Sequence, residues 1–245
     1  MRIAVVNPNT TASMTAKIGA AARAVAAPGT EILAAQPETG PASIEGFWDE
    51  AYSVPGLLVE IARAEKAGAD AHVIACFDDT GLEAARCAAR GPVIGIGEAA
   101  FHLASLLAHR FSVVTTLSRS IPAIENNLLR YGLDRRCARV RACEIPVLGL
   151  EDPASDASAR IGEEIERAKA QDHAEAIVLG CAGMADLAAR LSERHGLPVV
   201  DGVAAAVKLA ESLVALGLRT SKIGGYAPPL PKAFAGGAPE GAPGR

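Results

Sequence analysis

Aromatic side chains are scarce in this 245-residue sequence, in which Phe, Trp and Tyr together make up 4 % of the residues. Long apolar runs are missing as well, and no stretch approaches the roughly 20 residues that a membrane-spanning helix needs. The hydrophobic residues, 50 % of the chain, are mainly small or aliphatic, and Gly is abundant beside them. This composition favours helices packed tightly against short sheets, so the sequence predicts an α/β fold.

An excess of positive charge is also absent. Lys and Arg number 24 against 28 Asp and Glu, which gives a formal net charge of −4. This balance argues against a protein that binds nucleic acid or an acidic membrane surface, so we expect a small molecule as the partner. No positively charged segment followed by an apolar run and a cleavage site precedes the first strand-like residues, which predicts a cytoplasmic location.

Sequence motifs for metals, nucleotides and serine nucleophiles are missing. The five cysteines form no CxxC pair, and neither they nor the histidines have the spacing of a metal site. The sequence contains no P-loop and no GxSxG turn. Residues 95–100, GIGEAA, match only part of the dinucleotide-binding glycine pattern and are interpreted as a plain turn from strand to helix. We therefore predict no metal site.

Strand-like apolar runs alternate with helical stretches along the chain. The predicted strands cover residues 3–6, 71–75, 92–96, 111–116, 175–180 and 197–200. In the predicted helices, apolar residues recur mostly every three or four positions. These helices cover residues 11–26, 54–67, 97–107, 157–170, 182–194 and 203–216. Such alternation predicts parallel sheets covered by helices.

The sequence also contains an internal repeat. Residues 71–100 resemble residues 176–206, because AHVIAC matches AIVLGC, LEAAR matches LAAR and PVIGIGEAA matches PVVDGVAAA. A second pair, RIAVV at 2–6 and RFSVV at 110–114, agrees with it. The alternative is that Ala-rich and Val-rich segments match by chance. The shared order of strand, cysteine, helix and strand favours two related α/β units.

The repeat predicts two similar α/β domains related by a pseudo-twofold axis. The first comprises residues 1–97 with about 205–231, and the second comprises about residues 98–204. The Gly-rich and Pro-rich residues 232–245 are expected to form a disordered tail. The carboxyl ends of both sheets, where α/β proteins bind ligands, then converge on one cleft, with a cysteine of each unit facing the other.

These two cysteines, Cys76 and Cys181, each end a hydrophobic strand and precede a helix. A thiol near the amino end of a helix lies beside unpaired backbone N–H groups and a partial positive charge, which favour its thiolate. The same donors can hold an oxyanion. For one cysteine alone, the alternative is an inert buried thiol. Two cysteines at equivalent points of a repeat predict a function.

A pair of thiols on opposite sides of a substrate suits the inversion of a stereocentre. One cysteine removes a proton from a carbon acid as a thiolate, and the other returns a proton to the opposite face as a thiol. Their roles exchange with the handedness of the substrate, and no redox partner or leaving group is required. Disulfide chemistry is the competing interpretation, but it needs sulfur atoms about 2 Å apart, whereas the substrate carbon separates the thiols of a racemase.

The sequence resembles the hydantoin racemases, a branch of the aspartate/glutamate racemase superfamily with the allantoin racemases as close relatives. The segments that carry the resemblance are VVNPNT at 5–10, PASIEGFWDEA at 41–51, ACFDDTGLEAAR at 75–86 and VLGCAGMADL at 178–187. The resemblance runs from the first residue to about residue 231. It implies two α/β domains, no cofactor, a homo-oligomer, and Cys76 and Cys181 as the acid/base pair that epimerises C5 of a 5-monosubstituted hydantoin.

The motifs at the two cysteines read CFD and CAG, where the amino-acid racemases of the superfamily typically have CNT and CTH. Neither cysteine has an Arg or Lys beside it, although the carboxylate of an amino acid would want such a partner. A neutral ring therefore fits better than a zwitterion. The alternatives are an allantoin racemase, then an amino-acid racemase, then a non-catalytic protein that binds a small ligand in the same cleft.

Polar residues after the first strand of each unit are candidate substrate contacts. Asn7, Asn9 and Thr10 can hydrogen-bond a ring carbonyl or N–H group, with Asn7 as the favoured contact. Their alternative is an Asn-Pro turn with a Thr cap on the following helix. By the repeat, Thr115 and Thr116 occupy the same place in the second unit, where the alternative is to cap the end of a strand. The other predicted contacts are Ile44, Phe77, Pro146, Ala182 and Gly183.

Two aspartates follow the first cysteine of the pair. Asp78 and Asp79 can assist proton transfer, but Asp before a helix most often caps it, and we favour the cap. The remaining cysteines, Cys87, Cys137 and Cys143, have no partner in the repeat. They are interpreted as structural or surface thiols.

Overall fold

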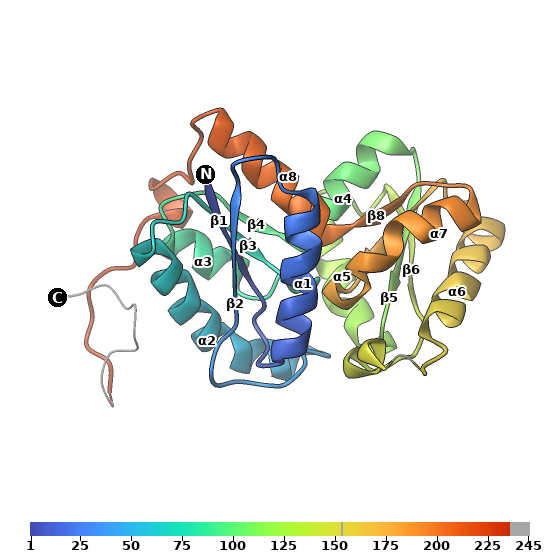
Figure 1. The fold of residues 1–245 in the computed structure, drawn as a ribbon, viewed down its shortest axis with the longest axis horizontal. Helices are drawn as coiled ribbons and strands as arrows, with labels where there is room; N and C mark the ends of the chain where they lie inside the picture. The colour runs from blue at the N-terminus through green and yellow to red at the C-terminus, as the bar shows by residue number, and fades with distance from the viewer. Residues whose placement is uncertain (153, 236–245) are drawn as a thin grey trace.

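The computed structural model describes residues 1–152 and 154–235. Its strands form two parallel four-stranded sheets, one on each side of a central layer of helices (Figure 1). The strand order is β2-β1-β3-β4 in the first sheet and β6-β5-β7-β8 in the second, so each strand of one sheet has a counterpart in the other. This identical order confirms the prediction of an α/β fold made of two similar units.

The strands are short, and the two sheets match in register at their centres. The first sheet contains β1 (Arg2–Val6), β2 (Glu31–Ala35), β3 (Ala71–Ile74) and β4 (Val93–Gly95). The second sheet contains β5 (Phe111–Thr115), β6 (Cys137–Ala142), β7 (Ala176–Gly180) and β8 (Val199–Asp201). The pairing of the two central strands is equivalent in both sheets, because the first paired residues are Ile3 with Ala71 in one sheet and Phe111 with Ala176 in the other.

Successive side chains of the central strands point to opposite faces of their sheet, because Cβ atoms alternate along a strand. In β1, Ile3 and Val5 enter the core between the two sheets, whereas Ala4 and Val6 pack on the outer face. The same alternation holds along β7. Burial on both faces explains why these runs are apolar throughout and show no alternating polar pattern.

Helices form a central layer and two outer layers (Figure 1). The central layer consists of α1 (Ala12–Val25), α4 (Ile96–Leu107), α5 (Ile121–Arg130) and α8 (Gly202–Ala215). The outer layers are α2 (Phe47–Lys66) with α3 (Leu82–Ala88) on the first sheet, and α6 (Ala157–Gln171) with α7 (Ala188–His195) on the second. Phe101 of α4 contacts Phe77, Phe111 and Tyr131, so one hydrophobic core joins the inner faces of both sheets.

The sequence prediction misses β2 and β6, and the physical reason is clearest for β6. Its residues read CARVRA, and the arginines resemble a basic surface segment. Arg141 is buried instead, and its Nε lies 2.6 Å from Asp172 Oδ2, so the ion pair neutralises the charge inside the fold. Cys143, just after the strand, is buried as well. The short helix α5 is also absent from the prediction, whereas the helix expected after Cys76 is present as α3.

Two predicted helices have different boundaries. The helix expected at 54–67 begins earlier, at Phe47. Proline is usually found in the first turn of a helix, but α2 continues through Pro55. The helix expected at 182–194 is a 3₁₀ segment, Ala182–Leu187, followed by α7. The predicted turn at 95–100 is confirmed, because β4 ends at Gly95 and α4 begins with the next residue.

The segment that contains Gly225 and Tyr226 packs on α3. Arg86 lies 5.6 Å from the centroid of the Tyr226 ring, and the Cys87 thiol donates to the carbonyl oxygen of Gly225 at 3.4 Å. Residues 232–235 are exposed and form no helix or strand, and the rest of the predicted tail, 236–245, lies outside the described residues.

The chain passes from the first sheet to the second through α4, and α8 follows the last strand of the second sheet. These crossings lie near the predicted domain boundaries, which stay a prediction. In the described part of the chain, no helix is long and apolar enough to cross a membrane.

Candidate active site

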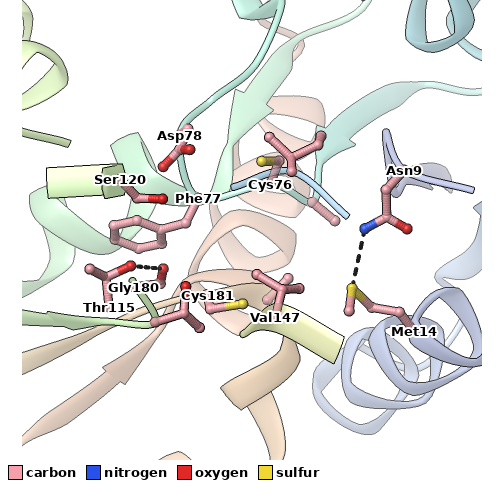
Figure 2. Close-up of a pocket in the computed structure, with 14 residues that line it drawn as sticks. Asn9, Met14, Cys76, Phe77, Asp78, Thr115, Ser120, Val147, Gly180 and Cys181 are labelled. Carbon is pink, nitrogen blue, oxygen red and sulfur yellow. Dashed lines mark hydrogen bonds between the residues drawn. The ribbon is translucent and has the colours of Figure 1, made fainter. Parts of the chain in front are cut away.

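A small cavity lies where the carboxyl ends of the two sheets meet. Its wall includes Cys76, just beyond β3, and Cys181, directly after β7. Figure 2 shows the two cysteines on opposite sides of the pocket. The loop after β1 contributes Asn9, and the end of β5 contributes Thr115. Equivalent central strands of both sheets therefore build one site, at the place where open α/β sheets bind ligands.

The Cys76 thiol lies in a turn that supplies hydrogen-bond donors. Thr80 Oγ1 donates to Cys76 Sγ at 3.4 Å, and the backbone N–H of Asp78 donates to the same sulfur. Burial nevertheless raises the pKa of Cys76 well above its usual range, and the carboxyl groups of Asp78 and Glu50 also act to raise it. The free thiol is therefore the favoured form while the cavity is closed.

Cys181 is the equivalent thiol of the second unit. The backbone N–H of Gly183 donates to its sulfur, but burial raises the pKa of Cys181 to about 12, and Asp78 adds to the rise. The predicted thiolate at a helix terminus is wrong for this closed cavity, because desolvation of the charged sulfur outweighs the N–H donors. For Cys76 a further reason applies, since α3 begins only at Leu82.

Replacing Thr80 by valine should slow the alkylation of Cys76 by iodoacetamide roughly tenfold or more, because a hydrogen bond to a charged group contributes about 1.5–3 kcal/mol. The lost donor is the hydroxyl that stabilises the thiolate. Mass spectrometry of the modified peptides measures each cysteine separately, so Cys181 is an internal control. Thr80→Ser keeps the hydroxyl and should react like the wild type. Equal rates for the valine variant and the wild type would contradict this assignment.

The structure brings most of the predicted site residues to the cavity wall. They are Ile44, Cys76, Phe77, Thr115, Thr116, Cys181 and Ala182. Thr115 Oγ1 donates to the carbonyl oxygen of Gly180 at 2.9 Å, an approach that needs glycine, because a Cβ there would lie 2.8 Å from Thr115 Cβ. The hydroxyl of Thr116 has no hydrogen-bond partner among the described residues.

Two predicted contacts on the first loop lie outside the cavity wall. The Asn7 side chain is buried, and its amide donates to Asn9 Oδ1 at 2.8 Å and to Thr15 Oγ1 at 3.0 Å. The Thr10 hydroxyl donates to the carbonyl oxygen of Pro41 at 3.2 Å. Both side chains hold the loop in place, and Asn9 is the residue of this loop that reaches the wall.

Two predicted contacts in the second unit are also outside the wall. Pro146 is exposed, and its neighbour Val147 lines the cavity instead. Gly183 lies behind the wall, where a Cβ would come 2.9 Å from Leu150 Cδ1. Its carbonyl oxygen accepts a hydrogen bond from Lys17 Nζ at 2.7 Å.

The wall also contains Asn9, a candidate contact predicted from the sequence, and Asp78, which was interpreted from the sequence as a helix cap. The wall residues that the sequence prediction does not include are Met14, Ala75, Ser120, Val147 and Gly180. Ala75 and Gly180 immediately precede the two cysteines, so their place on the wall could have been predicted from the sequence. Met14 and Ser120 come from helical segments whose approach depends on tertiary packing, so no local pattern marks them.

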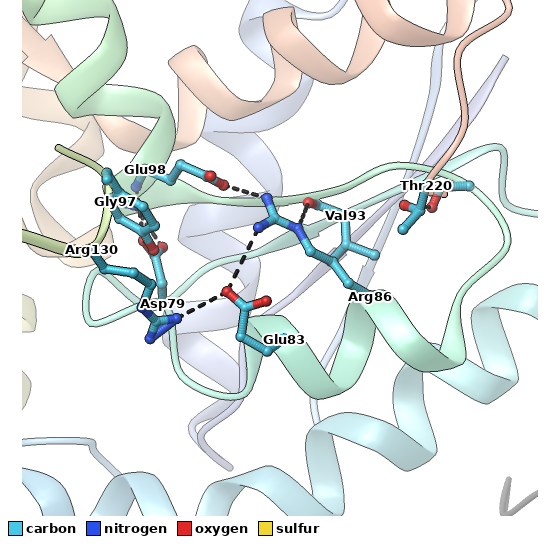
Figure 3. Close-up of polar contacts among 10 residues, drawn as sticks. Asp79, Glu83, Arg86, Val93, Gly97, Glu98, Arg130 and Thr220 are labelled. Carbon is cyan, nitrogen blue, oxygen red and sulfur yellow. Dashed lines mark hydrogen bonds and ion pairs between the residues drawn. The ribbon is translucent and has the colours of Figure 1, made fainter. Parts of the chain in front are cut away.

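Asp79, rather than Asp78, caps a helix, and that helix is α4. The Asp79 carboxylate accepts hydrogen bonds from the backbone N–H groups of Gly97 at 2.9 Å and Glu98 at 2.8 Å, and from the Tyr131 hydroxyl at 2.7 Å. Figure 3 shows Asp79 beside Gly97 and Glu98. Burial raises the pKa of Asp79 to about 7, and these three hydrogen bonds oppose the rise. The cap fixes the turn after β3 to the central layer.

Lysine and arginine are missing from the cavity wall, in which Asp78 is the one carboxyl group and the two cysteines are the other titratable groups. All five cysteines are free thiols. Across residues 1–152 and 154–235, no group of three or more His, Cys, Asp or Glu side chains is arranged to hold a metal ion. The wall thus combines thiols, one carboxyl group, hydroxyl groups and apolar side chains.

Hydrogen bonds join the two units near the cavity. The backbone N–H of Val147 donates to Glu45 Oε1 at 2.9 Å, and Ser13 Oγ donates to Glu151 Oε2 at 2.8 Å. The cavity has a volume of about 30 Å³, roughly the share of one molecule in liquid water.

Comparisons with known proteins identify the family of this chain. The family model described as Asp/Glu/Hydantoin racemase matches residues 3–210. The chain belongs to this racemase family. Over 236 residues the racemase is 54 % identical to a hydantoin racemase of Rhizobium meliloti, and the match covers 96 % of this chain and 98 % of that protein.

Two solved structures of allantoin racemases are also similar to the racemase. The protein from Klebsiella pneumoniae has a TM-score of 0.97 and 52 % identity, with 99 % of each chain covered. The protein from Pseudomonas fluorescens has a TM-score of 0.92 and 46 % identity, with 96 % of this chain and 100 % of that chain covered. The resemblance predicted from four sequence segments is confirmed, and the protein is an isomerase of the racemase class.

Proposed function

We propose that the racemase interconverts the enantiomers of 5-monosubstituted hydantoins, with Cys76 and Cys181 as its acid/base pair. The observation that carries the proposal is the position of both thiols on the wall of one cavity, each at the carboxyl end of an equivalent central strand. Thiols in this arrangement reach a planar ring from both faces. That is the geometry a two-base inversion requires.

The proton transfers run across the plane of the ring. The thiolate of one cysteine takes the proton from C5, and the electron pair of the C–H bond moves onto the adjacent carbonyl oxygen to give an enolate. The thiol of the other cysteine donates its proton to the opposite face of C5, and the electron pair returns to form the new C–H bond. The net charge is unchanged, and the sulfurs have exchanged roles, ready for the other enantiomer.

The polar groups on the wall suit a neutral ring. Asn9 Nδ2 donates to Met14 Sδ at 3.3 Å, and a thioether is a weak acceptor, so this amide is available to a ring carbonyl. The hydroxyls of Thr116 and Ser120 have no partner within the described residues. No lysine or arginine of the described residues lines the cavity to pair with the carboxylate of a free amino acid, so an amino acid fits the cavity less well than a neutral ring.

Binding of the ring requires the cavity to open. A hydantoin is larger than the space of about 30 Å³ in the closed form. The hydrogen bond between Glu45 and Val147 joins the two units beside Ile44, and it has to break as the ring enters. Closure over the bound ring would then exclude water from the proton transfers.

Allantoin is the second candidate substrate, favoured by the similarity to the two allantoin racemases. Allantoin is a hydantoin with a ureido group at C5, so the same proton transfer applies. The two candidates differ only in the C5 substituent. Apolar wall residues such as Ile44, Phe77 and Val147 favour an apolar substituent.

Polarimetry of L- and D-5-benzylhydantoin, with allantoin in parallel and a buffer blank, tests the proposal. Decay of both hydantoin enantiomers to zero rotation faster than the blank supports it. If allantoin alone responds, the second candidate replaces the first. If no ring responds, the proposed substrate class is wrong, and racemisation of L-glutamate and L-aspartate is the next assay. Assembly as a homo-oligomer and independence from a cofactor stay predictions of the resemblance, and the cytoplasmic location also stays a prediction.

A further inference from the structure

One carboxyl group on the cavity wall has no role in holding the fold. Asp78 is only 9 % exposed, yet its carboxyl oxygens have no hydrogen-bond or ion-pair partner among the described residues. Figure 2 shows Asp78 near Phe77 and Ser120, on the wall that also carries both cysteines. A buried polar group without a partner costs free energy, so a group of this kind on a cavity wall points to a ligand.

The backbone around Asp78 is fixed by contacts that leave its side chain unused. Asn127 Nδ2 donates to the Asp78 carbonyl oxygen at 2.7 Å, and the Asp78 N–H donates to the Cys76 sulfur. The next residue, Asp79, supplies the cap for α4. Since the neighbouring aspartate caps the helix, capping does not explain the carboxyl group of Asp78.

The surroundings of Asp78 favour its neutral form. Burial raises the pKa of Asp78 to about 8, and the carboxyl groups of Glu50 on α2 and Asp79 in the same turn raise it further. The other titratable groups on the cavity wall are the thiols of Cys76 and Cys181, and no lysine or arginine lines the cavity. The carboxyl group therefore keeps its proton at pH 7 and loses it as the pH rises through about 8.

We propose that Asp78, as a neutral carboxyl group, donates a hydrogen bond to the carbonyl oxygen of the bound ring on which negative charge develops when C5 loses its proton. The role rests on the proposed function. Asp78 keeps its proton throughout, while the C5 proton passes to one sulfur and the new proton comes from the other. A buried donor aimed at developing charge stabilises the transition state more than the ground state.

A neutral Asp78 also makes the thiols easier to ionise. As a carboxylate it would raise the pKa of both cysteines, because its charge acts on each sulfur. Protonation removes that repulsion from both sides of the ring at once. The neutral form of Asp78 therefore stabilises the enolate by a hydrogen bond and favours the thiolate by removing a negative charge. Both effects are needed whichever sulfur is the base.

Replacement by asparagine and by alanine separates this role from a structural one. Asp78→Asn keeps a neutral donor of the same size, so kcat/KM at pH 7 should stay within about tenfold of the wild type, whereas Asp78→Ala should lose about 10²–10³-fold, mainly in kcat. The wild-type rate should fall as the pH rises above about 8, the pKa of Asp78. Asp78→Asn should lack that fall. Asp134→Asn, at an exposed site, is the matched control and should leave rate and pH profile unchanged.

Alkylation of the resting protein gives a readout that needs no substrate. At pH 9 the Asp78→Asn variant should react with iodoacetamide at Cys76 and Cys181 severalfold faster than the wild type, because the carboxylate charge that raises the pKa of both thiols is gone. Unchanged alkylation would overturn the coupling to the thiols.

The activity results separate failure of this role from failure of the proposed function. An active wild type with an equally active Asp78→Ala variant overturns the role of Asp78 alone. An asparagine variant as slow as the alanine variant also overturns it, because a carboxylate would then be required. A wild type inactive on 5-benzylhydantoin and allantoin overturns the proposed function and this role with it.

Discussion

Serine at position 76 or 181 should lower racemisation of both hydantoin enantiomers by at least about 10³-fold, because a positioned acid or base contributes about 10²–10⁴-fold and each sulfur serves as both. A hydroxyl group is far less acidic than a thiol, so Cys76→Ser cannot supply the thiolate for one enantiomer, and it is a poor acid for the other. The same reasoning applies to Cys181→Ser. Initial rates of optical rotation from each pure enantiomer give the measurement.

The matched control for these variants is Cys87→Ser. Cys87 lies on α3, and its thiol donates to the Gly225 carbonyl oxygen outside the cavity, a contact that a serine hydroxyl can keep. This variant should retain the wild-type rate. A cavity variant that keeps more than about a tenth of the wild-type rate for both enantiomers would show that the proton transfers do not need two acid/base groups.

Alanine at position 97 should destabilise the fold and slow the enzyme. A Cβ on Gly97 would lie 2.4 Å from the Phe77 carbonyl oxygen and 2.9 Å from Asp79 Oδ2, so the turn after β3 has to move. Overpacking of this kind costs about 1–3 kcal/mol, which corresponds to a Tm roughly 3–10 °C lower for a chain of this length. Because the same turn carries Cys76, kcat should fall as well, by at least about tenfold for a displacement near 1 Å.

Gly225→Ala is the control for the stability measurement. A Cβ at Gly225 meets nothing within 4 Å, and Gly225 is not among the residues with a positive φ angle. Thermal unfolding followed by circular dichroism should therefore give Gly225→Ala the Tm of the wild type. A Gly97→Ala variant with unchanged Tm and unchanged kcat would mean that the turn tolerates the displacement, and that the tight packing against α4 does not position Cys76.

The sequence predicts the strands of the site because these strands are buried on both faces. The run AIVLG of β7 is apolar from end to end, and the cysteine after it marks the carboxyl end of the strand. Because the same pattern is repeated at β3, the sequence alone predicts that Cys76 and Cys181 lie at equivalent positions of the two sheets. The βαβ alternation predicts parallel sheets, since parallel strands need a helix between them, but it does not give the strand order or the edge strands β2 and β6.

Contacts that depend on other elements could not be predicted from local patterns. Two adjacent aspartates before a helix both resemble caps, yet Asp79 reaches α4 and Asp78 is left on the cavity wall. The approach of Asp79 requires the missing side chain at Gly95, where a Cβ would lie 2.1 Å from Asp79 Oδ1. That requirement involves residues sixteen or more positions apart in the chain.

The prediction that both thiol pKa values are lowered was wrong for a similar reason. Donors near a strand end are a local feature, and the sequence predicts them for Cys76 and Cys181. Burial depends on how the two units close over the cavity, and it raises both pKa values.

Racemisation of one pure enantiomer of 5-benzylhydantoin in D₂O tests the two-thiol account most directly. Samples are quenched at low conversion, and the deuterium at C5 is measured in the recovered substrate and in the product after chiral separation, with a blank for spontaneous exchange. Two acid/base groups on opposite faces predict deuterium in the product enantiomer while the recovered substrate keeps its protium. Equal deuterium in both enantiomers from the earliest time points would mean that one group serves both faces, and would contradict the account.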